Sequence, residues 1–207
     1  MRASKAKTKI RQEQIARGAM KLLAVRGWRR VSLASIARQV GVVPSAVYRH
    51  FKGKDDMLDA VLDLVGERFQ ANILAARESS SDPIVQLHEA LARHVNLIAS
   101  GVPVPRIILS EDIFTGHRRH RKRVHAIYQA YLGAVGAIIR EGQRQKVIRR
   151  EWEAEDLSLM WLGLVQSPAI LWLLGQRQFD LRQHCDRAWR IFAEMIHLGR
   201  SRKRKEK

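Results

Sequence analysis

Small and polar side chains are concentrated between Gly41 and Gly53, namely at Pro44, Ser45, Ala46, Tyr48 and Arg49. Such side chains fit the major groove when they lie at the N-terminal end of a helix. An arginine there can donate two hydrogen bonds to one guanine, which is worth about 1–3 kcal/mol of discrimination between bases. A phosphate contact, or solvation alone, is an equally good interpretation of Arg49.

A helix-turn-helix would present these side chains. Ser32 is a good N-cap for a short helix, and Gly41 supplies the tight turn after it. Pro44 suits the first position of the next helix, which is expected to end at about Phe51. A preceding helix is expected from about residue 8 to 26, where Gly27 follows. Apolar side chains are expected to lock the second and third helices together: Ile36, Ala37, Val42, Val47 and Phe51.

Positive charge is concentrated around this motif. The chain has 207 residues and a net charge of +18, and residues 1–54 contain 14 Lys or Arg against Glu13 alone. Residues 201–207 add five basic residues and one acid, so the middle of the chain is close to neutral. This distribution predicts salt-dependent binding of a polyanion. Residues 1–8 are expected to be a basic arm that contacts DNA or, equally well, a disordered charged end, and residues 201–207 a disordered tail.

Residues 31–58, VSLASIARQVGVVPSAVYRHFKGKDDML, resemble the DNA-binding domain of the TetR family of transcriptional regulators. The match lies in the Gly-Val pair at 41–42, in the sequence YRHF at 48–51 and in Lys54, all at the family's spacing. The quoted stretch is 28 of the 207 residues. Val43 departs from the pattern, because the family often has a Ser or Thr there that caps the recognition helix, so a slightly weaker helix start is expected.

The resemblance implies two sets of DNA contacts. Phosphate contacts, which set the register on the duplex, are implied for Ser32, Tyr48, His50 and Lys54. Base edges are implied to face Pro44, Ser45, Ala46 and Arg49. For His50, packing against the first helix is the alternative interpretation.

The rest of the chain predicts helices and no strands. The expected fold is all-α, with about nine helices. A three-helix DNA-binding domain at 1–54 is followed by a helical dimerisation and ligand-binding domain at 55–200. Residues 116–123, GHRRHRKR, are expected to form a basic loop that is solvated or faces DNA.

Residues 157–175 contain no charged side chain and approach the length of a membrane span. A buried helix is the preferred interpretation, and a membrane-associated protein is the less favoured one. Together with the last helix, at about 180–198, this segment is too apolar for a small monomer, which predicts a homodimer with a four-helix interface. The N-terminus lacks the apolar core of a signal peptide, so a cytoplasmic protein is expected.

A small, largely apolar effector is expected in the second domain. Trp161 and Trp172 are eleven residues apart and therefore lie on one helix face. The cavity would be completed by Leu109, Phe114, Tyr128 and Trp152. Ordinary core aromatics and interface anchors are the alternative interpretation of these six residues.

Enzymatic and metal-dependent functions are not indicated. The sequence has no phosphate-binding glycine loop, nucleophile elbow or pair of catalytic carboxylates, and its one cysteine, Cys185, excludes an internal disulfide and a Cys-based zinc site. His88 and His94 are six residues apart and lie on different sides of a helix. His117, His120 and His125 lie among cations that would repel a metal. No cofactor is expected.

The sequence therefore predicts a homodimeric transcriptional regulator that binds a palindromic operator. The resemblance implies a repressor, rather than an activator, that a small molecule releases from DNA. An architectural or nucleoid-associated DNA-binding protein without an effector is the alternative hypothesis.

Overall fold

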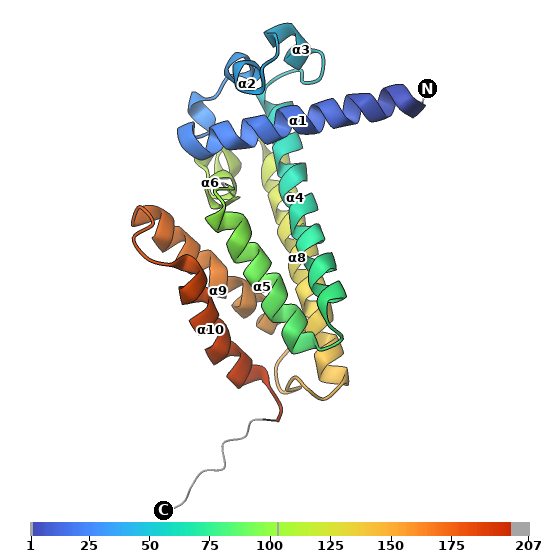
Figure 1. The fold of residues 1–207 in the computed structure, drawn as a ribbon, viewed down its shortest axis with the longest axis vertical. Coiled ribbons are helices and arrows are strands. Elements are labelled where there is room, and N and C mark those ends of the chain that lie inside the picture. The colour runs from blue at the N-terminus through green and yellow to red at the C-terminus, as the bar shows by residue number, and fades with distance from the viewer. Residues whose placement is uncertain (1, 103, 200–207) are drawn as a thin grey trace, which may run out of the picture. The chain divides into compact units, whose positions relative to one another are not determined.

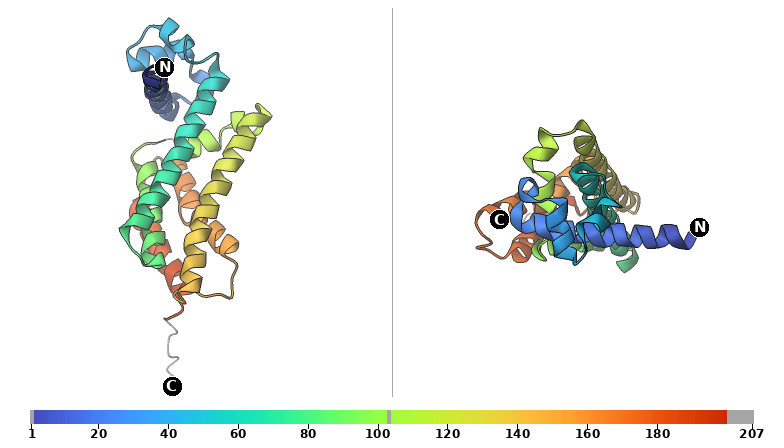
Figure 2. Two further views of the ribbon diagram at one scale, coloured as in Figure 1. Left: turned by 90° about the vertical axis from the view of Figure 1, so that its right-hand side faces the viewer. Right: turned by 90° about the horizontal axis from the view of Figure 1, so that it is seen from above.

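The computed structural model describes residues 2–102 and 104–199, which form ten α-helices, one 3₁₀ helix and no named strand (Figure 1, Figure 2). This confirms the all-α prediction. The elements are α1 (Arg2–Arg26), η1 (Trp28–Arg30), α2 (Leu33–Val40), α3 (Pro44–Tyr48), α4 (Lys54–Ser79), α5 (Pro83–Ala99), α6 (Val104–Ile108), α7 (Glu111–Phe114), α8 (Arg118–Arg144), α9 (Ala154–Leu174) and α10 (Leu181–Ile196).

The chain divides into two compact units, each of which is discontinuous in sequence. The first contains residues 1–68 and 100–128, and the second contains residues 69–99 and 129–207. Helices α4 and α8 are therefore each divided between the two units, α4 after residue 68 and α8 after residue 128. The boundary expected after residue 54 lies inside the first unit, because α4 continues in that unit to residue 68.

In the first unit, α1, α2 and α3 pack around a small apolar core. Ile15, Ala19 and Leu23 of α1 are buried, as are Ile36 of α2 and Val47 of α3. Figure 1 shows α1 beside α2 and α3. Helix α1 approaches α2 closely at Gly18, where an added Cβ would lie 2.1 Å from a methyl carbon of Val40.

Three sequence-based boundaries are wrong. Helix α1 begins at Arg2 instead of about Thr8, so residues 2–8 are helical and not a disordered end. The recognition helix α3 ends at Tyr48 instead of about Phe51. Residues 118–123, expected in a loop, form the first turns of α8. The tail expected to be disordered, 201–207, lies outside the described residues.

In the second unit, an aromatic cluster fills the space among α4, α5, α8 and α9. Phe69 and Tyr131 stack with ring centroids 4.5 Å apart, and the Trp161 ring meets Tyr131 edge to face at 5.8 Å. Trp161 Nε1 also donates a hydrogen bond to the Leu87 carbonyl oxygen at 3.1 Å. His94 lies in the same cluster, 4.9 Å from Phe69 between ring centroids.

Helix α9 has one buried face and one exposed apolar face. Residues at helical spacing, from Leu157 through Trp161 and Val165 to Trp172, are buried in the unit. Exposed apolar side chains remain at Leu159, Met160, Leu171 and Leu174. By length and composition, α9 is the one described helix that would also qualify as a membrane span.

Candidate nucleic-acid interface

The turn between α2 and α3 has the geometry that the glycine predicts. Gly41 has φ of +71°, a left-handed conformation that favours glycine, and its amide donates to the Arg38 carbonyl oxygen. The next amide, of Val42, donates to the Ala37 carbonyl oxygen at 3.0 Å. These hydrogen bonds end α2 and turn the chain directly into α3.

Helix α2 begins with a reciprocal cap. The Ser35 amide donates to Ser32 Oγ at 3.1 Å, and the Ser32 amide donates to Ser35 Oγ at 2.9 Å. This confirms Ser32 as the N-cap, and Ser35 takes the place of the Glu or Gln that usually completes such a capping box. Ser32 Oγ is thus an acceptor at the start of α2, and the Ser32 side chain is exposed.

Helix α3 has one buried side chain that anchors it to the core, and its other side chains are exposed or half-buried. Val47 is fully buried and Phe51, just beyond the helix, is also in the core. On the opposite side Tyr48 is 57% exposed. Four further predicted DNA-contacting residues are exposed or half-buried on this element: Pro44, Ser45, Ala46 and Arg49. These five residues are therefore accessible on α3 and at its C-terminal end.

The start and end of α3 explain its short length. Val43 occupies the N-cap position and provides no side-chain hydrogen bond, as its departure from the family pattern predicts. Pro44 follows at the start of the helix, where its missing amide proton costs nothing. Arg49 is the C-cap, so its side chain leaves from the end of the helix and not from its interior.

Lys54 has a structural partner that the sequence does not indicate. Its Nζ donates a hydrogen bond to the Trp28 carbonyl oxygen at 2.9 Å and lies 5.1 Å from the centroid of the Trp28 ring. An ammonium over an indole is attracted by the negative face of the ring. Lys54 therefore ties the start of α4 to η1, and any phosphate contact would use its remaining protons.

His50 is half-buried and meets α1 through its backbone. Gln12 Nε2 of α1 lies 3.5 Å from the His50 carbonyl oxygen, at the limit of a hydrogen bond. The segment that follows α3 is thus held against α1, while the imidazole keeps partial access to solvent.

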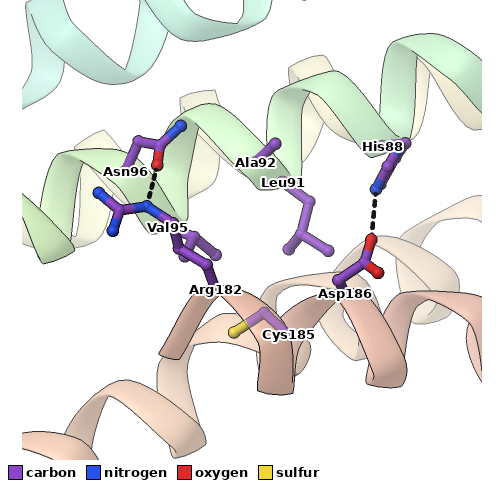
Figure 3. Close-up of a pocket in the computed structure, with 8 residues that line it drawn as sticks. All are labelled: His88, Leu91, Ala92, Val95, Asn96, Arg182, Cys185 and Asp186. Atoms are coloured by element: carbon purple, nitrogen blue, oxygen red, sulfur yellow. Dashed lines mark hydrogen bonds and ion pairs between the residues drawn. The ribbon is translucent and has the colours of Figure 1, made fainter. Parts of the chain in front are cut away.

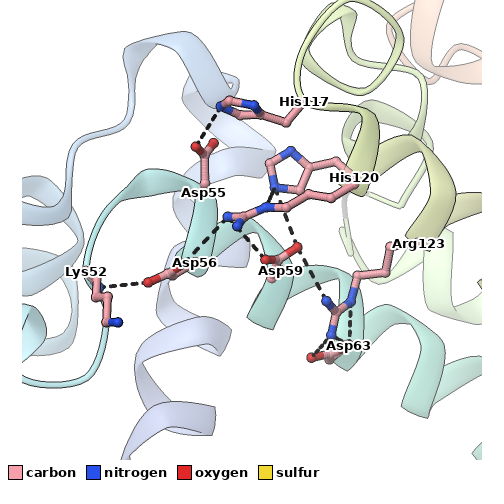
Figure 4. Close-up of polar contacts among 9 residues, drawn as sticks. Lys52, Asp55, Asp56, Asp59, Asp63, His117, His120 and Arg123 are labelled. Atoms are coloured by element: carbon pink, nitrogen blue, oxygen red, sulfur yellow. Dashed lines mark hydrogen bonds and ion pairs between the residues drawn. The ribbon is translucent and has the colours of Figure 1, made fainter.

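Carboxylates of α4 lie within 3.5 Å of arginine and histidine side chains of residues 117–123, and we call this set the ion-pair ladder (Figure 4). The ladder joins Asp55, Asp56, Asp59 and Asp63 to His117, Arg119, His120 and Arg123. At one end His117 Nε2 lies 3.0 Å from Asp55 Oδ2. At the other end Arg123 donates to both carboxylate oxygens of Asp63 at 2.6–2.8 Å.

The middle of the ladder is more buried and less tightly bonded. His120 is buried, and its Nε2 lies 3.5 Å from Asp59 Oδ1. That oxygen is enclosed but accepts no hydrogen bond, so Asp59 is held by charge at ion-pair distance. Asp56 also accepts a hydrogen bond from the Lys52 amide at 3.0 Å, which connects the ladder to the turn after α3.

The ladder explains why residues 118–123 are helical. Cations in the first turn of a helix oppose its dipole, and the sequence there offers no acid to compensate. The α4 carboxylates supply the compensating charge from another element. A sequence pattern read along one segment misses such a partner.

Removing the ladder's carboxylates should therefore loosen the start of α8. In the variant Asp55→Asn/Asp59→Asn/Asp63→Asn we expect amide hydrogen exchange at residues 122–126, whose amides donate to the carbonyl oxygens of the first turns of α8, to accelerate by about tenfold, since each charge contributes about 0.3–1 kcal/mol at a helix end. Exchange mass spectrometry measures this, with Asp156→Asn in the first turn of α9 as the control. Unchanged protection at 122–126 would contradict this explanation of the helix.

The residues predicted for an effector pocket are divided between the two units. In the first unit Leu109 and Phe114 are exposed and Tyr128 is half-buried. In the second unit Trp161 is buried in the aromatic cluster, and Trp172 stacks on Arg177 at 4.9 Å, while Trp152 is exposed. The pocket therefore stays a prediction. A cavity of the second unit, between α5 and α10, has a different lining.

Three contacts around the candidate interface were not predicted from the sequence. They are the Trp28 partner of Lys54, the α4–α8 ladder, and an ion pair at 2.7 Å between Arg29 of η1 and Glu111 of α7. The spacing of Asp55, Asp59 and Asp63 along one helix face was the available signal for the ladder. Among the described residues, no group of three metal-ligating side chains is close enough to hold a metal ion.

Comparison with known proteins covers nearly the whole chain. A family model described as "Bacterial regulatory proteins, tetR family" matches residues 15–61, and one described as "YsiA-like protein, C-terminal region" matches residues 63–195. The fatty acid metabolism regulator protein of Bacillus subtilis (strain 168) is 21% identical over 89% of this chain and 94% of its own length. The nucleoid occlusion factor SlmA of Vibrio campbellii is 21% identical over 94% of this chain and 99% of its own length.

A solved structure shows the same fold. The transcriptional regulator FadR from Bacillus subtilis, in complex with stearoyl-CoA, superimposes with a TM-score of 0.75 at 20% identity, covering 89% of this chain and 98% of that one. The arrangement of a helix-turn-helix followed by further helices is therefore shared.

Proposed function

The chain belongs to the TetR family of bacterial regulatory proteins, and we propose that it is a repressor whose homodimer binds a palindromic operator until a small effector releases it. Regulation of transcription and binding of DNA follow from the family. Repression, operator symmetry, the effector and action in the cytoplasm are the proposed parts.

The observation that carries sequence-specific binding is the surface of α3. A helix with a buried anchor at Val47 and an exposed row of small or polar side chains can enter the major groove without moving its own core. Arg49 leaves the end of this helix, where a long side chain can reach a guanine. The excess of cations within residues 1–54 would hold the same surface against phosphates.

Exposed apolar side chains support a homodimer. Leu159, Met160, Leu171 and Leu174 on α9, with Ile191 on α10, lack cover in the single chain. Two copies that pair these helices would bury the leucines and form the expected four-helix interface. A dimer of this kind carries two recognition helices related by a twofold axis, which requires an operator with the same symmetry.

The relatives suggest the chemistry of the effector. The Bacillus subtilis relative is named as a regulator of fatty acid metabolism, and the FadR structure contains stearoyl-CoA. An acyl compound agrees with the largely apolar effector expected from the sequence. We therefore take an acyl chain, free or as a thioester, as the effector class.

A nucleoid-associated function is the second candidate. It is favoured by the relative named as a nucleoid occlusion factor and by the basic residues at both ends of the chain. Relief of DNA binding by an acyl compound would separate the two, because an architectural protein needs no effector.

Substitutions in α3 test the assignment of DNA contacts. Arg49→Ala should change the preferred sequence and weaken binding to the best site by about 1–3 kcal/mol, while binding to unrelated DNA changes little. Tyr48→Ala should weaken binding to all sequences about equally, because phosphate contacts carry no base information. Selection from a random DNA pool, followed by fluorescence anisotropy, measures both effects.

Lys54→Ala should also weaken binding to all DNA sequences about equally. Because it removes the Trp28 contact, its thermal stability must be measured alongside. If Arg49→Ala selects the same sequences as the wild type, Arg49 does not read bases and the assignment is wrong.

A further inference from the structure

A small cavity lies between α5 and α10 in the second unit (Figure 3). Its volume is about 210 Å³. Leu91 and Val95 of α5 and Cys185 of α10 form a buried apolar floor, and Ala92 is half-buried beside them. An apolar floor of this kind favours a hydrocarbon group over water.

The two ends of the cavity are polar but electrically different. Figure 3 shows His88 and Asp186 at one end and Asn96 and Arg182 at the other. Asp186 lies 3.1 Å from His88 Nε2 and also accepts a hydrogen bond from Arg190 at 2.8 Å. These contacts, the His88 hydrogen bond above all, lower the pKa of Asp186 and balance its charge.

The Arg182 end keeps an uncompensated positive charge. Arg182 Nε donates to Asn96 Oδ1 at 2.6 Å, and no carboxylate of the described residues pairs with the guanidinium. Its two Nη groups are free to donate to a further acceptor. An arginine fork of this kind matches the geometry of a carboxylate.

We infer that this cavity binds a short acyl chain of about six to eight carbons, with its carboxylate or thioester carbonyl at Arg182. The size follows from the volume, since a methylene and a water each fill on the order of 30 Å³ in a condensed phase. This inference rests on the proposed function, in that it assigns the acyl effector a site. It differs from the pocket expected from the sequence, with which it shares no residue.

The proposed dimer leaves this cavity accessible. Arg182 and Ile191 are nine positions apart on α10. At 100° per residue, nine positions place two side chains on opposite sides of a helix. A partner that covers the exposed Ile191 therefore lies away from the Arg182 side.

Cys185 provides a reporter inside the cavity. It is the only cysteine of the chain, and burial raises the pKa of its thiol to about 11. Only a thiolate reacts quickly with a maleimide, so labelling of Cys185 requires both access and deprotonation. A chain lying on the cavity floor should slow the reaction further.

Octanoate and octanoyl-CoA are the two probes, added separately to the full-length dimer. We expect saturable binding of at least one of them by calorimetry, together with slower N-ethylmaleimide labelling of Cys185. Binding of octanoate identifies the free acid as the source, and binding of octanoyl-CoA alone identifies the thioester.

Three variants locate the site. Ala92→Trp should fill the cavity and abolish binding, and Arg182→Gln should weaken it by at least tenfold. Arg187→Gln removes an exposed arginine of the same helix and should bind like the wild type. Thermal melts of each variant show whether it is folded.

Two results would overturn the inference: no saturable binding of either octanoyl probe, or binding that Ala92→Trp leaves unchanged. Release of DNA is measured separately. Octanoyl binding in the cavity without release of DNA would uphold the site and contradict the proposed effector function. The opposite result is an acyl compound that releases DNA without slowing the labelling of Cys185, and that releases it equally well from the Ala92→Trp variant. That result would uphold the proposed effector function and contradict the site between α5 and α10.

Discussion

Replacing Leu171 and Leu174 of α9 with glutamate is expected to give a folded monomer that binds operator DNA about 100-fold more weakly than the wild type. The two side chains are 63% and 75% exposed in the single chain, so the substitution removes no core contact. In a dimer the same positions would bury two charges per protomer without partners, which is strongly unfavourable. A monomer lacks the second, linked DNA-binding domain, whose avidity raises the affinity for DNA by a factor of about 10²–10⁴.

Analytical ultracentrifugation and fluorescence anisotropy measure the two consequences. Leu74→Glu is a matched control, because Leu74 is an exposed leucine on α4 outside the expected interface. It should leave both the oligomeric state and DNA affinity unchanged. A dimer that persists in Leu171→Glu/Leu174→Glu would show that the interface lies elsewhere on the chain.

The second large effect concerns acid stability and the buried His94. His94 is 1% exposed, its Nδ1 lies 3.2 Å from the Tyr131 hydroxyl, and its Nε2 has no hydrogen-bond partner. Burial lowers the pKa of His94 from 6.5 to about 4. The unfolded chain therefore takes up this proton at a higher pH than the folded one.

Acidification should lower the stability of the folded protein through His94. The contribution of His94 is fully present above pH 6.5 and is lost progressively as the pH falls to about 4. The loss amounts to about 3 kcal/mol of the free energy of unfolding, at 1.36 kcal/mol per pKa unit. We expect His94→Gln to have a shallower dependence on pH across this range, whatever its stability at pH 7.

Urea denaturation at several pH values between 7 and 4 measures this slope. The control is His125→Gln, which removes an exposed histidine of α8. If His94→Gln keeps the full wild-type slope, or if His125→Gln loses it as well, the acid sensitivity does not arise from His94.

The parts of the fold that local chemistry dictates were predictable from the sequence. Gly41 is needed for a left-handed turn, Ser32 for a cap, and Val47 for a buried anchor, and each of these requirements involves residues within a few positions of one another. The same holds for the apolar face of α9. The exposure of the residues predicted to contact DNA was predictable for the same reason, because that short motif carries them.

Features that depend on a second element were not predictable. The segment 118–123 looks like a basic loop until the aspartates of α4 are placed beside it. From the sequence alone, Lys54 is expected to contact only phosphate, whereas in the structure its ammonium group contacts the ring and the carbonyl oxygen of Trp28. The six aromatic and aliphatic residues proposed for a pocket share chemistry, but composition says nothing of whether they meet.

The proposed function requires a dimer that binds a palindromic operator and dissociates from it when an acyl compound binds. DNase I footprinting on the intergenic DNA beside the gene, with and without octanoyl-CoA and stearoyl-CoA, tests both requirements in one experiment. We expect one protected palindrome, with half-sites about one helical turn or a multiple of it apart, that loses protection when an acyl compound is added. Protection spread over unrelated sequences and indifferent to both compounds would contradict the proposed function and favour an architectural protein.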